Sequence, residues 1–302
     1  MNRHKERGFV LLITLFVVSL LTIIIFEIYS QSRADLRAAE NFRDDLAAYY
    51  LALSGITGEK EILKDDLKNG QLDYSGELWA AAAPPVPIGE GTVSGKITDE
   101  SGKFNLNSLL DANDHPILFK KNQLGNLFRL LSVDPFLVDP IIDWVDKNEQ
   151  TEPNGAEDET YQVRKPPYPT KNGRLDTIEE MLYIDGITPE VYQTISPYLT
   201  ISTNGMINVN TADSIILQSI DPIIDESIAK QLMEGIPYNN AQDFFTALPA
   251  GNYKNGMNFS TLFTVGSSVF SIQSTGTVRD TDKSIHAIWD RAQKKYLYFK
   301  VE

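Results

Sequence analysis

The chain has 302 residues, enough for about two or three folding units. Its 27 basic and 41 acidic residues give a net charge of −14, which disfavours electrostatic capture of nucleic acid over a broad surface. A hydrophobic fraction of 42% excludes both wholesale disorder and a multi-span membrane protein. The absence of cysteine excludes disulfides, thiolate metal sites and cysteine nucleophiles.

An apolar segment from Phe9 to Phe26 is the first feature along the chain, and basic residues precede it. As a helix it would be roughly 27 Å long, close to the hydrocarbon thickness of about 30 Å. The basic flank places the N-terminus in the cytoplasm and the rest of the chain outside, anchored once. A cleaved secretory signal is the alternative, but Glu27, Ile28 and Tyr29 follow where small residues would mark the cleavage site.

The polar leader ends at Gly8, and the apolar run begins at Phe9. This order resembles the leader of type IV pilins and type II secretion pseudopilins, in which a prepilin peptidase cuts after the glycine and methylates the new N-terminus. The resemblance implies cleavage between Gly8 and Phe9. Most members carry glutamate at the fifth mature position, which here is Ile13. Among pseudopilins, the missing glutamate marks the K-type minor subunit at the tip.

From Ile28 to Leu67 the apolar residues continue at steps of mostly three and four, and Asn69-Gly70 supplies a stop signal. One helix over residues 9–69 follows. Near the membrane this stripe should bury against neighbouring helices of an assembly, with Leu36, Phe42 and Leu46 as partner-binding candidates. Beyond about Phe42, a seam that faces the protein's own core is the alternative.

The exported body divides into a connector with a first strand (70–104), a helical insertion (105–263) and C-terminal strands (264–302). Alternating apolar residues predict strands near 92–100, 268–278, 285–291 and 295–301. A long helix packed on an antiparallel sheet, with a large helical insertion, is an α+β fold of the pilin-like kind.

The insertion contains an internal repeat, because the phrase at 102–108 recurs at 205–211. In each copy a short helix follows, ends at an Asp-Pro turn and gives way to a second helix, so two related hairpins are expected. These resemble helix-hairpin-helix modules that grip DNA backbones. The turn at 185–187 is flanked by acidic residues that would repel phosphate, so a protein scaffold is favoured and no nucleic-acid partner is expected.

An acidic stretch between Asp139 and Tyr161 holds eight acidic residues and the single base Lys147. Asp143 and Asp146 are three residues apart on a helix, so both carboxylates can point to one side. The loop that follows returns Glu157 and Asp158. Oxygen ligands that converge from a helix end and a loop suit Ca²⁺, and these four acids are the candidate ligands. A fully solvated acidic loop is the alternative.

K-type minor pseudopilins typically show an Asp-Trp-x-Asp helix end, a Gly-Ala-Glu-Asp loop, a tyrosine and a Pro-Pro-Tyr. Here these stand at 143–146, 155–158, 161 and 166–168. The resemblance implies calcium binding in the insertion, an inner-membrane anchor in lipid with a periplasmic body, and partners of the I and J types.

The function implied is a non-enzymatic subunit that caps the tip of the type II secretion pseudopilus and helps to initiate its assembly. The three histidines are scattered and no serine elbow is present, so no catalysis is indicated. A membrane-tethered DNA-uptake receptor and a type IV pilus minor pilin remain the alternatives.

Overall fold

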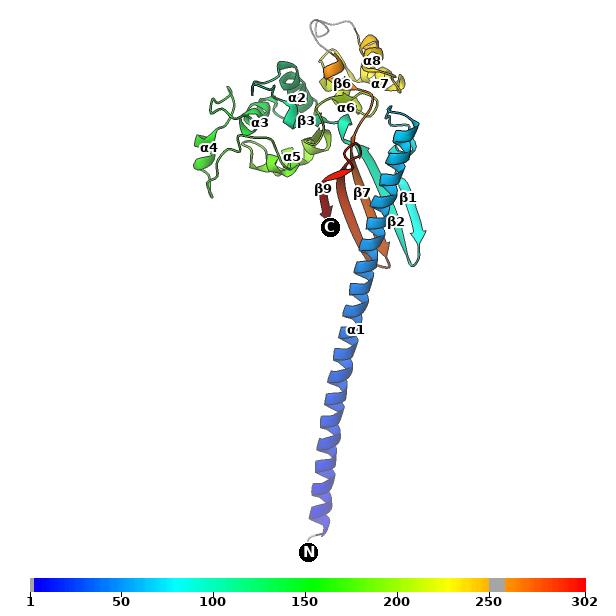
Figure 1. Cartoon of the computed structure of the whole chain (residues 1–302). Coiled ribbons are helices and arrows are strands. Elements are labelled where there is room, and N and C mark those ends of the chain that lie inside the picture. The colour runs from blue at the N-terminus through cyan, green and yellow to red at the C-terminus, as the bar shows by residue number, and fades with distance from the viewer. Residues whose placement is uncertain (1–2, 250–258) are drawn as a thin grey trace.

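The computed structural model describes residues 3–249 and 259–302, so residues 1–2 of the expected leader and 250–258 of the expected insertion lie outside the described residues. One helix dominates the shape. α1 (Arg3–Asn69) is 67 residues long and ends where Asn69-Gly70 predicts a stop. Its first part projects alone from the molecule, and its last part packs on the sheet (Figure 1).

The sheet is antiparallel, has five strands and runs in the order β1-β2-β7-β8-β9. Its strands are β1 (Ala83–Ile88), β2 (Gly91–Asp99), β7 (Val269–Val278), β8 (Thr281–Asp290) and β9 (Lys295–Val301). β2 pairs with β7, so the strands before and after the insertion lie side by side. Four of these strands were predicted. β1 was not predicted and lies in the expected connector, because its prolines obscure the strand pattern. Proline is tolerated there because β1 is an edge strand.

α1 buries small and branched residues on one face of the sheet. Ala48, Ala52, Ile56 and Leu63 are fully buried there. The helix approaches so closely that a Cβ atom on Gly276 of β7 would collide with the carbonyl oxygen of Ala48. Such close packing explains why alanine and glycine occupy the contact.

The apolar stripe predicted along α1 divides into two faces. Ile56 and Leu63 face the sheet, whereas Phe42 and Tyr50 are 71% and 59% exposed. An α-helix has 3.6 residues per turn, so apolar residues spaced at a different average interval gradually move to another side of the helix. The C-terminal part of the stripe therefore packs in the protein's own core, and the part nearer the N-terminus forms an outward apolar face.

The insertion folds around one apolar core built from short helices and two small parallel strand pairs. Its helices are α2 (Leu118–Leu130), α3 (Val138–Val145), α4 (Asp158–Gln162), α5 (Pro189–Ile195), α6 (Ser214–Ser219), α7 (Glu226–Glu234) and α8 (Ala241–Ala247). β3 (Phe104–Asn105) pairs with β4 (Leu199–Thr200), and β5 (Ile207–Asn208) pairs with β6 (Phe263–Thr264). The insertion stands beyond the C-terminal end of α1 and to one side of the sheet (Figure 1).

The two copies of the repeated Asn-x-Asn phrase make equivalent contacts. The Asn107 side chain bonds both the N–H and the C=O of Leu175, at 2.8 and 3.0 Å. Asn210 does the same with Tyr238, at 2.8 and 2.9 Å. The second asparagine of each phrase therefore satisfies the backbone hydrogen bonds of a distant segment and holds that segment to its own repeat. The units then dock, since Asn126 of α2 donates to the carbonyl of Ser219 in α6 at 3.1 Å.

Candidate functional site

The acidic stretch begins on α3 and continues into an irregular loop. Two buried carboxylates of α3 accept hydrogen bonds from this loop and hold it in place. Asp143 is fully buried, and its carboxylate accepts the N–H of Glu152 at 3.0 Å. The backbone at Gly155 lies so close that a Cβ atom there would collide with this carboxylate. Asp143 therefore shapes the loop as well as lining it.

Asp139 holds the tip of the same loop, a role that the sequence pattern did not single out. Its carboxylate accepts the backbone and side-chain N–H groups of Asn154, at 3.1 and 3.0 Å. Lys121 of α2 pairs with Asp139 at 2.8 Å and with Glu152 at 2.6 Å. The loop thus receives a cation from a helix distant in the sequence, whereas Lys147 contacts Asp114 at 3.5 Å.

Glu157 is the acid in this region whose buried carboxylate oxygens lack hydrogen-bond partners. Its side chain is buried, and neither carboxylate oxygen has a hydrogen-bond partner. Burial and the negative charges of Asp143 and Asp146 raise the pKa of Glu157 to about 7. Burial and the charge of Asp143 likewise raise the pKa of Asp146 to about 6. Three of the four predicted ligands therefore share one buried acidic region.

The fourth predicted ligand is placed differently. Asp158 is exposed at the start of α4, and its carboxylate accepts the N–H of Thr170 at 2.7 Å. In the described part of the chain, no three of the four predicted acids have ligand oxygens within 4.8 Å of one another. The structure therefore gathers Asp143, Asp146 and Glu157 into a region without drawing them into a closed ligand shell.

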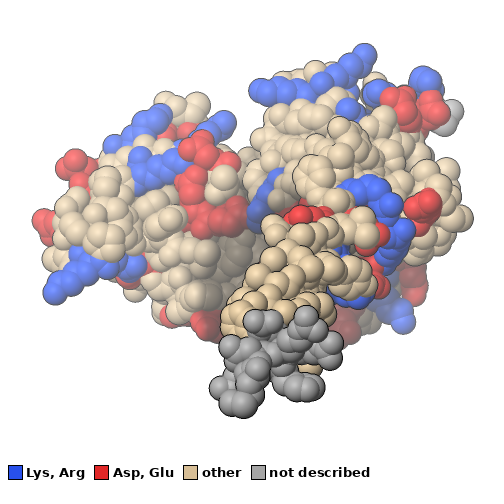
Figure 2. Space-filling view, turned by 90° about the horizontal axis from the view of Figure 1, so that it is seen from below, with Lys and Arg blue, Asp and Glu red and all other residues tan. Residues whose placement is uncertain are grey.

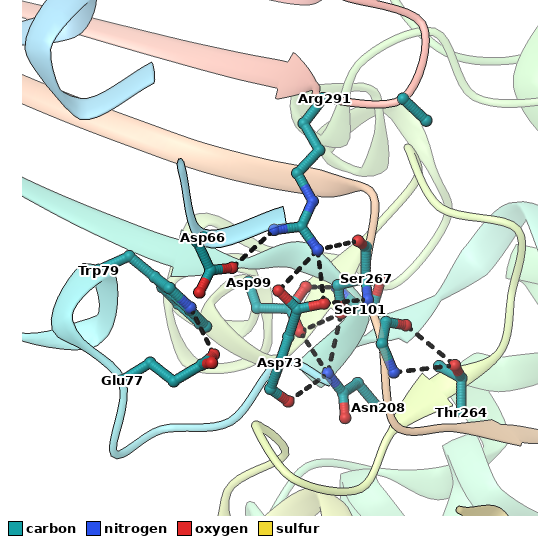
Figure 3. A network of polar contacts seen from close by, with 12 residues as sticks. Asp66, Asp73, Glu77, Trp79, Asp99, Ser101, Asn208, Thr264, Ser267 and Arg291 are labelled. Atoms are coloured by element: carbon teal, nitrogen blue, oxygen red, sulfur yellow. Dashed lines mark hydrogen bonds and ion pairs between the residues drawn. The ribbon is translucent and has the colours of Figure 1, made fainter. Parts of the chain in front are cut away.

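Three other acids do meet within 4.8 Å, namely Asp66, Asp73 and Glu77. Figure 3 shows Asp66 and Asp73 next to the guanidinium of Arg291, and Glu77 beside Trp79. Arg291 reaches Asp66 at 2.9 Å and Asp73 at 2.6 Å. Asp66 and Asp73 are thus paired with an arginine, whereas Glu77 accepts the N–H groups of Trp79 and Tyr74, at 2.7 and 3.0 Å. The group therefore works as a junction of ion pairs and hydrogen bonds.

A second buried acid, Asp99, ties this junction to the insertion. Its carboxylate accepts hydrogen bonds from Asn208 at 3.1 Å and Ser267 at 2.5 Å (Figure 3). It also accepts one from Thr211 at 2.6 Å. Burial raises the pKa of Asp99 although these donors oppose the shift. Sequence reasoning missed the network, because its members are far apart in the chain and nothing local marks them as neighbours.

α1 contains the only segment in the described residues that is long and apolar enough to cross a membrane, and it lies near the N-terminus. Gly8 and Phe9 both belong to this helix, and the Phe9 side chain is exposed. The three partner-binding candidates lie farther along, where Leu36, Phe42 and Leu46 are 60%, 71% and 44% exposed. They therefore form an outward apolar face of α1 that nothing in the described chain covers.

Comparison with known proteins agrees with this arrangement. A family model described as "Type II secretion system (T2SS), protein K" matches residues 102–204. A type II secretion system protein K from Pectobacterium carotovorum is 29% identical, over 69% of this chain and 67% of the relative. One from Pseudomonas aeruginosa is 27% identical, over 92% of this chain and 86% of the relative.

A solved structure shares the fold. The crystal structure of the GspK-GspI-GspJ complex from enterotoxigenic Escherichia coli contains a chain that matches with a TM-score of 0.70 and 20% identity. The match covers 89% of this chain and 99% of that one.

A long apolar helix packed on an antiparallel sheet, with a helical insertion between β2 and β7, defines a pilin-like fold, and within the described residues α1 alone is long and apolar enough to cross a membrane. The fold and the similarity to type II secretion system protein K support the identification of this chain as a minor pseudopilin of the K type.

Proposed function

We propose that this minor pseudopilin caps the tip of the pseudopilus and helps to initiate its assembly for protein export across the outer membrane. The observation that carries the proposal is the position of the insertion. The membrane-spanning part of α1 lies at one pole of the molecule and the insertion at the other, beyond the end of α1 (Figure 1). A subunit stacked above along the helix axis would meet this bulk, so growth ends here.

The proposed partners are the I-type and J-type minor pseudopilins, which accompany the K-type chain in the similar solved complex. The outward face of α1 at Leu36, Phe42 and Leu46 is the proposed contact. Apolar side chains this exposed lose water when a neighbouring helix covers them, at about 25 cal/mol per Å² of apolar area.

The proposed location is the inner membrane, with α1 in lipid and the body in the periplasm. Prepilin peptidase would cut between Gly8 and Phe9 and leave an N-methylated Phe9. Mass spectrometry of the mature chain tests this step. A valine at Gly8 should leave a longer, uncleaved protein, and a mature chain that begins elsewhere would contradict the processing.

The role in initiation is tested by counting filaments. Cells that lack this chain but make a normal amount of the major pseudopilin should form far fewer pseudopili, because tip assembly precedes elongation. Re-expression of the chain should restore the number. Unchanged filament numbers in the deletion strain would overturn the role in initiation.

We further propose that the acidic region binds a calcium ion. The support is chemical, since Asp143, Asp146 and Glu157 are buried oxygen donors and both Glu157 oxygens lack hydrogen-bond partners. Ca²⁺ accepts six to eight oxygens in tolerant geometry, which suits donors from a helix and a loop. When bound, the ion would supply positive charge to this region and hold the loop on α3.

A further inference from the structure

The two edges of the sheet differ in what they offer to another chain. β1, at one edge, contains Pro84, Pro85 and Pro87, which lack the N–H groups that a pairing strand needs. β9, at the other edge, has no proline, and its Phe299 and Val301 are 41% and 44% exposed. Only the β9 edge is therefore open to strand addition.

The hydrogen-bond register shows which backbone groups of β9 face outward. Glu302 exchanges both backbone bonds with Ser284 of β8, at 3.1 and 2.8 Å. In an antiparallel ladder such pairs alternate with pairs whose N–H and C=O groups point away from each other. Phe299 and Val301 hold the alternate positions, so their backbone groups point away from β8 to the open side.

A cavity of about 280 Å³ lies next to this edge, between the sheet and the insertion. Figure 2 shows the two lobes from below with a recess between them. The partners of Phe299 and Val301 on β8 are Ala287 and Ile285, which are buried beneath α1. The cavity is on the opposite face, where its lining includes Glu179, Tyr192, His286, Leu297 and Tyr298.

One of the carboxylates that line the cavity forms no ion pair within the described residues. Of the acids that line it, Glu100 pairs with Lys103 at 2.5 Å, and Asp176 pairs with Lys171 at 2.7 Å. Glu179 is exposed and forms no ion pair with any described residue. Burial and the charge of Glu179 raise the pKa of Tyr192, and the charge of Lys300, which pairs with Glu302 at 2.6 Å, opposes this shift. A carboxylate beside tyrosine rings suits a lysine or arginine side chain.

We infer that β9 accepts an extended segment of a second polypeptide as an additional strand, and that a basic side chain of this segment enters the cavity. Side chains of a strand alternate between the two faces of a sheet. One set would lie beside Phe299 and Val301, and the other beside Tyr298 at the cavity. Backbone pairing supplies affinity, and the cavity selects lysine or arginine. This site is independent of the α1 face and of the capping role.

The test starts from random peptides of about nine residues, the length of a long strand, selected on the full chain in detergent micelles. Enriched peptides should alternate apolar residues and carry a lysine or arginine. Phe299→Pro should weaken their binding at least about tenfold, because it removes an outward N–H while the β8 ladder keeps its bonds. Phe299→Val, which keeps that N–H, should retain most of the binding.

The cavity is tested with Glu179→Gln. This variant should bind the enriched peptide about tenfold more weakly and no longer prefer lysine to norleucine at the basic position. Glu190→Gln, an exposed change on α5 outside the cavity lining, should alter neither property. Failure to enrich any peptide, enrichment without a basic residue, equal binding of backbone N-methylated peptides, or β9-dependent dimers of the chain itself would each overturn the inference.

Discussion

Arg291 is the residue on which the junction of α1, the connector and the sheet depends. Its side chain is 2% exposed, and it forms ion pairs with both Asp66 and Asp73. Buried ion pairs are seldom a source of net stability, but removing one partner leaves a charge buried without compensation. The junction therefore fixes the geometry at the top of α1 and makes it sensitive to single substitutions.

Arg291→Met is expected to lower the free energy of unfolding by about 3–5 kcal/mol, because Asp73 would stay buried without its cation. Arg279→Met is the control. Arg279 also joins the sheet to α1, through Asp44 at 3.2 Å, but its side chain is 53% exposed and its loss should cost less than about 1 kcal/mol. Denaturant titration of the full chain in detergent measures both, and equal losses would contradict the role assigned to Arg291.

Glu59 gives a residue-scale test of pH dependence. It is buried against β2, and burial raises its pKa to about 8. Between about pH 5 and 8 the folded state keeps this proton and the unfolded chain has released it, so stability should fall as the pH rises. The loss is up to about 4 kcal/mol over that range. Glu59→Gln should flatten the curve, and parallel curves for the two proteins would reject the assignment.

At the scale of elements, α1 and four strands were predictable because their signals are local. Hydrophobic length, alternation and the Asn69-Gly70 stop all lie within the segments that they describe. β1 was hidden by its prolines, and the ion pairs of Arg291 and Lys121 join residues far apart in the chain. The acidic region was predictable in composition, but the roles of Asp139 and Asp143 in anchoring the loop depend on its folded path.

The outward face of α1 yields a prediction about partners. Phe42→Arg should reduce co-purification with the I-type and J-type pseudopilins at least about tenfold, because a buried charge would replace an apolar contact. Asn41→Arg introduces the same residue at the neighbouring exposed position, which lies about 100° or more around the helix from Leu36, Phe42 and Leu46, and it should have little effect. Similar losses for both variants would show that charge on α1, and not the apolar face, governs assembly.

The acidic region yields a prediction about calcium. A ligand that binds the native state alone stabilises it by about 2.7 kcal/mol at a hundredfold excess over Kd, so the chain should melt higher in calcium than in chelator. Glu157→Gln should remove most of the difference, whereas Glu149→Gln, an exposed change in the same loop, should keep it. Magnesium should substitute poorly, because it gives up water reluctantly. Equal melting temperatures in calcium and chelator would show that the acidic region binds no calcium.

At the scale of the whole molecule, the chain has a long helix and carries its bulk at the end opposite the apolar N-terminal segment (Figure 1). The Asp99 and Arg291 network joins the sheet to the insertion, so the bulk is fixed relative to α1 by buried polar contacts. A rigid connection of this kind suits a terminal subunit, because a loosely tethered insertion would not block the addition of the next one.

The most direct test of the central claim is the position of this chain on the filament. Gold-labelled antibody against the insertion, applied to isolated pseudopili and viewed by electron microscopy, should mark one end of each filament and leave its length unlabelled. Gold particles distributed along the filaments, with no excess at either end, would contradict the capping role.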